Sequence, residues 1–389
     1  LEDAAVKNGD SLQAIVRLGL LASNCYSRAF AYVDAAGTVS TWGSPAYGGD
    51  PPPSVQEQLT DVYQVQHAAA FFQAGAFAAL KGDGSVVTWG ETAFGGKLAE
   101  QEKLQNVEAI QSTLYAFAAL LSDGHVVTWG DANNGGDSGH VQPLLSEVVA
   151  IQATEKAFAA IRRDGVVIAW GDEHRGGDCS VVQPYLRQVS AIQASTSAFA
   201  AISDAGVVTW GDPACGGDSS CVKDQLKGVK QIQATCAAFA ALTHHGLVVT
   251  WGDEDRGGDS SEASEHLHDV QHLQSTSAAF SALRRDGCVY AWGDVARGGD
   301  CSTVQEQLRD VQQLQATLSA FAALRRDGSV ITWGDAVRGG DSSKVQSELR
   351  DVQQIQASGA AFAAIRSDGK VITWGDSVRG GDSTLVQEQ

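Results

Sequence analysis

Short apolar runs separated by glycine-containing turns set the pattern of this chain. Between residues 311 and 334, three of these runs predict β-strands: Val311–Ala316, Ala320–Leu324 and Val330–Gly334. Asp327-Gly328 lies between the second and third runs, and this dipeptide is the strongest short signal of a β-hairpin turn. The pattern therefore predicts a small antiparallel sheet.

A polar segment follows the third predicted strand. It contains a Gly-Gly pair, which permits backbone turns closed to other residues, and then the sequence "DSSKVQSELRD". Asp or Ser can cap a short helical turn here, with Val345 and Leu349 at i, i+4 spacing. We expect one or two helical turns that connect one sheet to the next.

The same pattern recurs along the whole chain. Trp-Gly marks each recurrence, at Trp42, Trp89, Trp129, Trp170, Trp210, Trp251, Trp292, Trp333 and Trp374. The intervals between successive Trp residues are 47, 40, 41, 40, 41, 41, 41 and 41 residues. A Phe precedes each Trp by 12 residues, or by 11 in one unit. A period in this range indicates a solenoid, a propeller or a similar array, here with nine units.

The residues around each Phe indicate how the sheets pack. Ala residues flank Phe321 in "SAFAAL", so small groups and an aromatic ring occupy a strand covered on both faces. Nine small antiparallel sheets, each covered by the next, describe propeller blades, whereas a β-helix has parallel rungs without Asp-Gly hairpins. We expect the aromatic residues to form the structural framework, in particular Trp129, Trp170, Trp251, Trp292, Trp333, Trp374, Phe321 and Phe362.

The repeat "AFAALRRDGSVITWGD…GG" resembles that of the RCC1-like β-propeller family. Its period is closest to that of the β-lactamase inhibitor protein II type, which has short three-stranded blades. The resemblance implies an all-β propeller of nine three-stranded blades with short helical connectors, in a single domain over residues 1–389. The pattern leaves open whether nine units close into a ring.

Strand order predicts which loops share an end of the array. The loop before each Phe and the triplet after each WGD lie at one end, and the Asp-Gly turns lie at the other. The triplets vary, reading ANN, EHR, PAC, EDR, VAR, AVR and SVR in units 3 to 9. Variable loops on a repeated frame are typical of recognition sites, although neutral drift of exposed loops is the alternative. The candidate partner-binding residues here are Asn133, Asn134, His174 and Arg175.

Two apolar insertions fall at the same predicted end. One contains Leu18, Leu20 and Leu21, and the other contains Phe71 and Phe72. An exposed apolar patch marks a docking site, so we include these five residues among the candidate partner-binding residues. Alternatively they cap the array, because terminal repeats are commonly atypical.

Arg residues lie beside several Asp-Gly turns at the other end. They occur as pairs at Arg162 and Arg163, Arg284 and Arg285, and Arg325 and Arg326. They form either a basic rim for an acidic partner or solvated ion pairs with the nearby Asp residues.

Other candidate chemistry is weaker. The Asp residues of WGD and GGD, such as Asp335 and Asp341, are spaced unlike calcium-binding loops, and turn capping explains them more simply. We interpret the seven Cys residues as recurring at no repeat position. Cys215 and Cys221 bracket a Gly-rich turn, but a metal site would need two further ligands nearby. The polar residues are mostly copied in every unit, whereas a catalytic site is normally unique. We expect no enzyme activity, cofactor or metal.

Composition narrows the choice of partner. The net charge is −19, which disfavours nucleic acid, and the longest apolar run is too short to insert into a membrane. The absence of Met, with Leu at position 1, leads us to expect a processed or partial chain. An organelle lumen or a secreted location fits, and the cytoplasm stays open. The sequence favours a non-enzymatic interaction scaffold, or a structural subunit of a multi-subunit complex, that binds another protein. The alternative is a secreted proteinaceous enzyme inhibitor.

Overall fold

The computed structural model describes residues 20–22, 28–34, 36–70, 73–98 and 104–382. The chain divides into two compact units, residues 1–110 and 111–389, and the boundary falls within strand β7 (Val107–Ser112). The expectation of one domain over residues 1–389 stays a prediction.

The described residues form nine three-stranded antiparallel sheets, called blades 1 to 9 in chain order. In each blade the strands follow one another as a meander, with the second strand in the middle. This arrangement confirms the prediction of an all-β propeller with nine blades and short connectors.

The strands of blades 1 to 3 are β1 (Leu20–Ala22), β2 (Ala29–Val33), β3 (Val39–Gly43), β4 (Val62–Ala69), β5 (Gly75–Lys81), β6 (Val86–Gly90), β7, β8 (Ala116–Leu121) and β9 (Val126–Gly130). Those of blades 4 to 6 are β10 (Val148–Ala153), β11 (Ala157–Arg162), β12 (Val167–Gly171), β13 (Ala191–Ala194), β14 (Ala198–Ser203), β15 (Gly206–Gly211), β16 (Val229–Ala234), β17 (Ala238–Thr243) and β18 (Val248–Gly252). Those of blades 7 to 9 are β19 (Val270–Ser275), β20 (Ala279–Arg284), β21 (Val289–Gly293), β22 (Val311–Ala316), β23 (Ala320–Arg325), β24 (Val330–Gly334), β25 (Val352–Ala357), β26 (Ala361–Arg366) and β27 (Val371–Gly375).

The described helices are all short. They comprise one α-helical turn, α1 (Pro53–Gln56), and the 3₁₀ turns η1 (Pro45–Tyr47), η2 (Thr92–Phe94), η3 (Ala132–Asn134), η4 (Gln142–Leu144), η5 (Glu173–Arg175), η6 (Gln183–Tyr185), η7 (Pro213–Cys215), η8 (Ser220–Gln225), η9 (Glu254–Arg256), η10 (Ser261–His266), η11 (Val295–Arg297), η12 (Ser302–Gln307), η13 (Ala336–Arg338) and η14 (Ser377–Arg379). Among the described residues, no helix is long and apolar enough to cross a membrane.

Blade 8 shows how closely the sequence pattern corresponds to the fold. Its first and third strands, β22 and β24, have the predicted bounds, and the second strand, β23, extends one residue further than predicted, to Arg325. Phe321 pairs directly with Trp333 across β23 and β24. The connector after blade 8 contains η13 and a further turn, in which the Leu349 N–H donates to the Val345 carbonyl oxygen at 3.2 Å.

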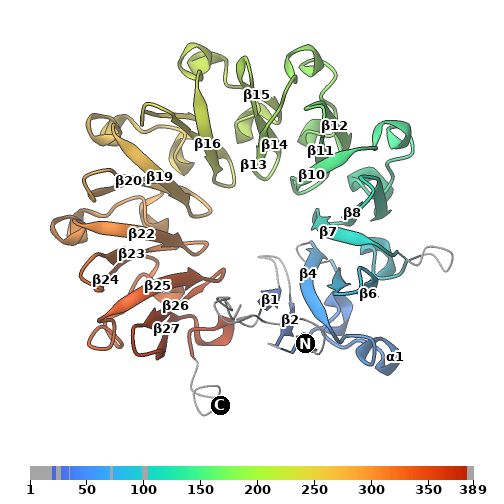
Figure 1. The fold of residues 1–389 in the computed structure, drawn as a ribbon, viewed down its shortest axis with the longest axis horizontal. Helices are drawn as coiled ribbons and strands as arrows, with labels where there is room; N and C mark the ends of the chain where they lie inside the picture. Colours follow the sequence, from blue (N-terminus) through green and yellow to red (C-terminus); the bar gives the residue numbers. More distant parts are fainter. Residues whose placement is uncertain (1–19, 23–27, 35, 71–72, 99–103, 383–389) are drawn as a thin grey trace, which may run out of the picture. The chain divides into compact units, whose positions relative to one another are not determined.

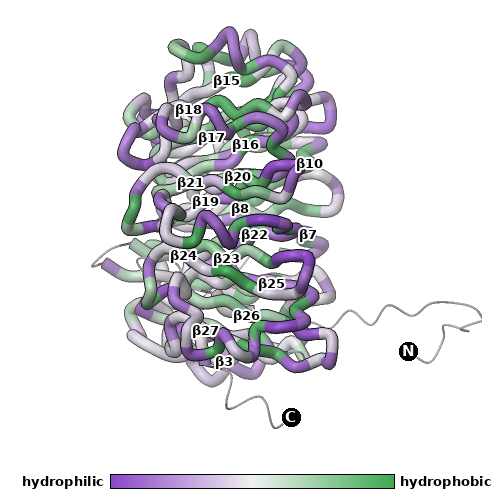
Figure 2. The backbone as a smooth tube through the Cα atoms, turned by 90° about the vertical axis from the view of Figure 1, so that its left-hand side faces the viewer, coloured by the Kyte–Doolittle hydropathy of each residue, from purple (hydrophilic) through white to green (hydrophobic). Residues whose placement is uncertain are grey.

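Within unit 2, the blades stand side by side along an arc, with the first strand of each blade on the inner side (Figure 1). Hydrophobic strand segments alternate with hydrophilic turns along the chain (Figure 2). The core lies between consecutive blades: buried Phe321 and Trp333 of blade 8 cluster with Ala279, Leu283 and Val289 of blade 7. Small Ala residues let neighbouring sheets approach, while the aromatic rings fill the remaining space.

Glutamine side chains join the inner strands of adjacent blades. The Gln313 Nε2 donates to the Ile355 carbonyl oxygen at 2.9 Å, and the Ile355 N–H donates to Gln313 Oε1 at 3.2 Å. Gln64 and Ile110 make the same two bonds within unit 1. Each Gln side-chain amide thus pairs with the neighbouring edge strand as a backbone peptide would. It satisfies one N–H and one carbonyl group of that strand.

A Gln of the connector pairs with the third strand of the blade in a similar way. Gln346 Nε2 donates to the Val330 carbonyl oxygen at 3.0 Å, and Ser342 Oγ donates to Gln346 Oε1 at 2.8 Å. Cys301 occupies the position of Ser342 in the preceding unit, and its Sγ donates to Gln305 Oε1 at 3.2 Å.

The prediction that the Cys residues recur at no repeat position is therefore wrong. Cys179 and Cys301 both follow GGD, and each thiol donates to the Gln four residues further on, Gln183 or Gln305. The small, buried side chain at this position needs only a hydrogen-bond donor, so Ser and Cys both serve.

Candidate interaction surface

Two kinds of loop meet at one end of each blade in unit 2. In blade 8, the Asp335 N–H that follows Trp-Gly donates to the carbonyl oxygen of Ser319, in the loop before Phe321. The separation is 2.9 Å. The loop before Phe and the triplet after WGD therefore lie at the same end, as strand order predicts.

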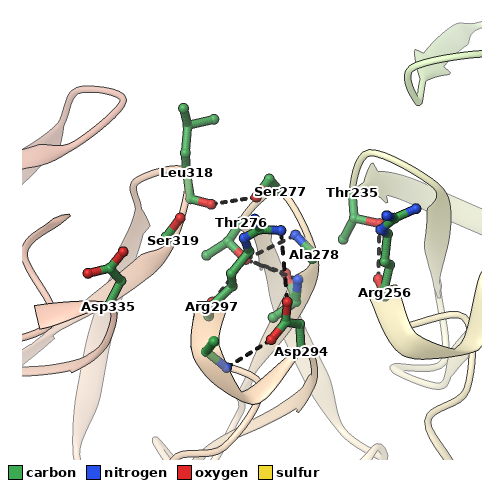
Figure 3. Close-up of polar contacts among 12 residues, drawn as sticks. Thr235, Arg256, Thr276, Ser277, Ala278, Asp294, Arg297, Leu318, Ser319 and Asp335 are labelled. Carbon is green, nitrogen blue, oxygen red and sulfur yellow. Dashed lines mark hydrogen bonds and ion pairs between the residues drawn. The ribbon is translucent and has the colours of Figure 1, made fainter. Parts of the chain in front are cut away.

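A buried hydroxyl group fastens the two loops together. In blade 8, Thr317 Oγ1 donates to the Arg338 carbonyl oxygen at 3.1 Å and accepts from the Ala320 N–H at 3.0 Å. Figure 3 shows the equivalent Thr276 beside Arg297 in blade 7. There, Thr276 Oγ1 donates to the Arg297 carbonyl oxygen at 3.0 Å. The seven hydroxyl residues, from blade 3 to blade 9, are Thr113, Thr154, Ser195, Thr235, Thr276, Thr317 and Ser358.

This hydroxyl clamp was not predicted from the sequence. The signal was present, because a Thr or Ser lies four residues before each Phe in units 3 to 9. Its role depends on a carbonyl group about 21 residues further along the chain, in the turn after WGD. A local pattern does not show that pairing.

The loops of adjacent blades are also joined to each other. A series of backbone hydrogen bonds of 2.8–3.0 Å runs from each loop to the next, and each N–H donates to the carbonyl oxygen of the following member. Its members are Leu114, Glu155, Thr196, Cys236, Ser277, Leu318 and Gly359. Side chains reinforce it, since Ser277 Oγ donates to the Leu318 carbonyl oxygen at 2.8 Å (Figure 3). We call this series the loop relay, and it links the loops of adjacent blades from blade 3 to blade 9.

In blades 3, 4, 5, 7 and 8 the Asp of the WGD motif caps the 3₁₀ turn that follows it, whereas Asp253 of blade 6 makes no cap bond and lies 3.4 Å from Arg256. Asp335 Oδ1 accepts from the Val337 N–H at 2.9 Å, and Asp131 Oδ1 accepts from the N–H groups of Asn133 and Asn134. Asp335 also lies 3.8 Å from Arg338 Nε. These carboxylates are therefore occupied by local partners.

The GGD carboxylates are occupied as well. Asp341 Oδ1 accepts from the Ser343 N–H at 2.8 Å, and hydrogen bonds from the Ser343 backbone and hydroxyl group lower the pKa of Asp341. Within the described part of the chain, no three His, Cys, Asp or Glu side chains gather as a metal site would require. The geometry explains the repeated Asp residues by turn capping.

The structure gives the four predicted residues of the triplets two different environments. Asn133 and His174 are exposed, and His174 lies 3.6 Å from Glu173. Asn134 is partly buried and donates through Nδ2 to Asp131 Oδ1 at 2.8 Å. Arg175 reaches Ser197 Oγ in the next blade. Asn133 and His174 thus face solvent, while Asn134 and Arg175 support the loops.

Blades 7 and 8 add an apolar part to this surface. Val295 is 68% exposed and Val337 is 71% exposed. Val295 is the first residue of its triplet and Val337 is the second residue of the next one. Both triplets were recognised as variable, but their Val residues were not selected as candidates. We call the exposed triplet residues Asn133, His174, Val295 and Val337 the variable surface.

The predicted N-terminal patch is only partly described. Leu18, Phe71 and Phe72 lie outside the described residues. The backbone of Leu20 and Leu21 forms part of β1, where they pair with Val33 and Tyr32. The docking and capping interpretations of this patch both remain predictions.

The opposite end of unit 2 carries the Asp-Gly turns. The first Arg of each pair makes an ion pair with the turn Asp, for example Arg284 with Asp286 at 2.9 Å and Arg325 with Asp327 at 3.2 Å. The second Arg of a pair, such as Arg326, is exposed. Arg162 pairs in the same way with Asp164, while Arg163 and Arg285 are exposed.

The framework residues lie between the blades. Trp129, Trp170, Trp251, Trp292, Trp333, Trp374, Phe321 and Phe362 are all buried. Each Trp stacks on the Phe of its own blade, with centroids 5.2 Å apart for Phe321 and Trp333. In blades 4 to 9 the indole N–H also donates to a Gly carbonyl group of the preceding blade, as Trp170 does to Gly135 at 3.0 Å.

Comparisons with known proteins identify similar folds. No family model matches the chain, and no curated protein matches it. Among solved structures, the chain is similar to the computationally designed Ika8 protein, with 16% identity and a TM-score of 0.37 over 81% of this chain and 98% of that chain. The ectodomain of the receptor kinase CR4 from Physcomitrella patens has 16% identity and a TM-score of 0.43 over 70% and 72% of the two chains.

A third similar structure is that of Prp20p from Saccharomyces cerevisiae, described with its binding properties to Gsp1p and histones. It has 16% identity and a TM-score of 0.39, over 64% of this chain and 80% of that chain. RCC1 and other β-propeller proteins are thus among the similar structures.

Proposed function

We propose that this chain is a non-enzymatic interaction scaffold, or a structural subunit of a larger assembly, that binds another protein through the variable surface. One observation carries the proposal: the triplets after WGD differ from blade to blade, while the backbone beneath them is held by the same hydroxyl clamp. A rigid frame with variable exposed loops is a common arrangement for recognition.

The chemistry of the variable surface fits a protein partner. It combines polar groups in blades 3 and 4 with the exposed Val residues of blades 7 and 8. Protein interfaces join an apolar centre to a polar surround in this way. The net charge of −19 disfavours nucleic acid, which needs clustered basic groups to release counterions.

The polar groups of the variable end support binding better than catalysis. The Asp and Thr side chains here are copied from blade to blade and make structural hydrogen bonds. A catalytic site needs a unique set of groups around one reacting atom. The proposal therefore includes the absence of enzyme activity.

The test is affinity capture from the native source, with variants of the variable surface. The variant Val295→Ser/Val337→Ser should weaken capture about tenfold or more, because burying one such apolar side chain against a partner is worth about 1.5 kcal/mol or more. The matched control is Arg163→Ser/Arg326→Ser, which changes two exposed side chains at the Asp-Gly end. Equal capture by both variants and the wild type would contradict the proposal.

The captured species separates the alternatives. One stoichiometric complex identifies a structural subunit, and exchangeable partners identify a scaffold. Capture of a single enzyme, together with loss of that enzyme's activity, would instead support the secreted inhibitor of the β-lactamase inhibitor protein II type.

A further inference from the structure

A groove lies on the outer side of blades 6 and 7 in unit 2. It has a volume of about 1240 Å³, and its walls are the turn and connector after blade 6 and the third strand of blade 7, β21. Every residue that lines it lies between Asp253 and Gln305, so unit 2 alone forms the groove. Pockets for small molecules have volumes of about 300–1,000 Å³, so this groove has room for a longer ligand, such as a peptide segment.

The lining of this groove is strongly acidic. Arg256 lies 3.4 Å from Asp253, and Arg297 lies 3.8 Å from Asp294, so each guanidinium group of the groove has one carboxylate partner. Five further carboxylates line the groove, are exposed, and make no ion pair within the described part of the chain: Glu254, Asp255, Asp259, Glu262 and Asp300. Carboxylates therefore outnumber guanidinium groups by five.

Hydrogen bonds hold two of these carboxylates in place without neutralising them. Asp259 accepts from the N–H and the hydroxyl group of Ser261, at 2.8 and 3.0 Å. Asp300 Oδ1 accepts from the Ser302 N–H at 2.8 Å, and hydrogen bonds from the Ser302 backbone and hydroxyl group lower the pKa of Asp300. Because these donors are uncharged, both carboxylates keep their full negative charge at neutral pH.

An aromatic pair forms part of the groove wall. The rings of His266 and Tyr290 stack with centroids 4.1 Å apart and an interplanar angle of 9°. Arg284 lies 5.9 Å from the Tyr290 ring, but it is paired with Asp286 at 2.9 Å. The aliphatic stems of Lys and Arg side chains lie readily along such surfaces while their charged ends contact carboxylates.

The next groove, between blades 7 and 8, has the same construction and a different chemistry. Its volume is about 750 Å³, and its acidic lining residues are Asp300 and Asp341. Three acidic residues of the first groove have uncharged equivalents 41 residues later: Glu254, Asp255 and Glu262 correspond to Val295, Ala296 and Thr303. The strongly acidic lining is therefore a property of one groove and not of the repeat.

We propose that the groove between blades 6 and 7 binds an extended basic peptide segment, rich in Lys or Arg, of a partner protein. Charge complementarity selects this occupant, because the excess of carboxylates attracts basic segments and repels acidic ones. Val295 belongs both to this groove and to the variable surface. The proposal thus rests on the proposed function and deepens it by giving the chemical class of the partner segment.

Fluorescence polarisation of a labelled hexaarginine peptide with the full chain tests the proposal. The peptide should bind, more weakly as salt rises, and a hexaglutamate peptide should not. The variant Glu254→Val/Asp255→Ala/Glu262→Thr gives the groove the residues of its neighbour. It should weaken hexaarginine binding about tenfold, because three exposed ion pairs are lost and each contributes modestly.

A matched control separates the groove from the overall charge. Asp204→Asn/Asp224→Asn/Asp310→Asn removes three exposed carboxylates of unit 2 that lie outside the groove. It should bind hexaarginine as the wild type does, and thermal unfolding checks that both variants fold. Equal weakening by the two variants would assign binding to the net charge and overturn the proposal. Failure of hexaarginine to bind, or equal binding of hexaglutamate, would overturn it too.

Capture of the native partner distinguishes this proposal from the proposed function. If Val295→Ser/Val337→Ser weakens capture but hexaarginine does not bind, the variable surface stands and the basic class of the partner segment is wrong. If hexaarginine binds in the groove but capture is unchanged by the Val substitutions, the groove stands and binding through the variable surface is wrong.

Discussion

The indole N–H of Trp333 donates to the carbonyl oxygen of Gly298, 3.0 Å away and 35 residues earlier in the chain. This bond joins the third strand of blade 8 to the turn after blade 7. Gly298 has φ +92°, and an added Cβ would lie 2.7 Å from the Phe321 ring. Trp333, Phe321 and Gly298 therefore form one interlocking contact between two blades, and only Gly fits beside the rings.

Removing the indole from this contact should destabilise unit 2. We expect Trp333→Ala to lower the free energy of unfolding by about 3–5 kcal/mol, since a large buried side chain leaves a cavity. Trp333→Phe keeps part of the packing and loses the bond to Gly298, so it should cost less. Chemical denaturation of both variants measures the difference, and an unchanged midpoint for Trp333→Ala would show that the ring carries no packing energy.

The hydroxyl clamp gives a second prediction. Thr317→Ala leaves the Arg338 carbonyl group and the Ala320 N–H without their buried partner and should cost about 1–3 kcal/mol. Thr317→Ser keeps the hydroxyl group, as Ser195 does in blade 5, and should recover most of that loss. Equal denaturation midpoints for the Ala and Ser variants would exclude a role for the hydroxyl group.

The Asp-Gly turns provide a matched pair of glycines. Gly328 has φ +78°, and an added Cβ would lie 2.8 Å from the Asp351 Cα at the start of blade 9. Gly369 has φ +84°, and its added Cβ would meet no heavy atom of the described chain within 4 Å.

Both Gly→Ala variants strain the backbone, so each should cost about 1 kcal/mol. Gly328→Ala should cost more, because it also forces Asp351 and the Val352 N–H, which donates to the Gly328 carbonyl oxygen, to move. Thermal unfolding of the two variants separates these contributions. A loss for Gly369→Ala as large as that for Gly328→Ala would contradict the contact.

His67 of unit 1 should make stability depend on pH. Its ring stacks on Phe77 with centroids 3.8 Å apart, and burial lowers its pKa from 6.5 to about 3. The unfolded chain therefore binds a proton below pH 6.5 that the folded chain does not accept until about pH 3. The stability of unit 1 should fall as the pH drops through this window, by about 2 kcal/mol at pH 5 from this group alone.

The variant His67→Phe removes the group that binds this proton and keeps an aromatic ring against Phe77. Denaturation of the wild type and the variant at several pH values gives the difference between them. That difference should be flat above pH 7 and should change between pH 6.5 and 3. Parallel pH profiles would assign the acid sensitivity to other groups.

The Cys residues should differ in reactivity. Cys179 is buried beside Gln183, and burial raises the pKa of its thiol to about 11, so little thiolate is present at neutral pH. Cys221 is exposed. Alkylation of the folded protein should modify Cys221 well before Cys179. Cys179→Ser should change stability by less than about 1 kcal/mol, because Ser138 makes the same bond in blade 3. Equal labelling rates would show that the Cys179 site opens readily.

Much of the fold follows from local signals. The bounds of Val311–Ala316 and Val330–Gly334 were predicted because turn residues flank short apolar runs, and the Asp327-Gly328 turn fixes how those runs pair. Because the same pattern recurs in every unit, the strand prediction for one unit is supported by the pattern of the others. The stacked Phe321 and Trp333 also follow, since their spacing places them opposite each other on paired strands.

The surface was harder to predict because exposure depends on contacts between distant residues. Asn134 and Arg175 were selected as variable polar residues, yet Asp131 and Ser197 hold their side chains. Val295 and Val337 have the opposite character: their apolar side chains suggest burial, but the turn projects them into solvent. The bridge from Gln313 to Ile355 spans 42 residues, and no local pattern of polar and apolar positions encodes it.

Because the loop relay joins adjacent blades in the same way at each step, the repeats of unit 2 are nearly interchangeable as building blocks. Each link, such as Ser277 to Leu318 and Leu318 to Gly359, uses backbone atoms that every residue type supplies, so the joints hardly depend on which repeats meet. Excision or duplication of one whole repeat would therefore leave compatible joints on both sides. Array length is thus open to evolutionary change through recombination, while the triplet of each repeat diversifies independently.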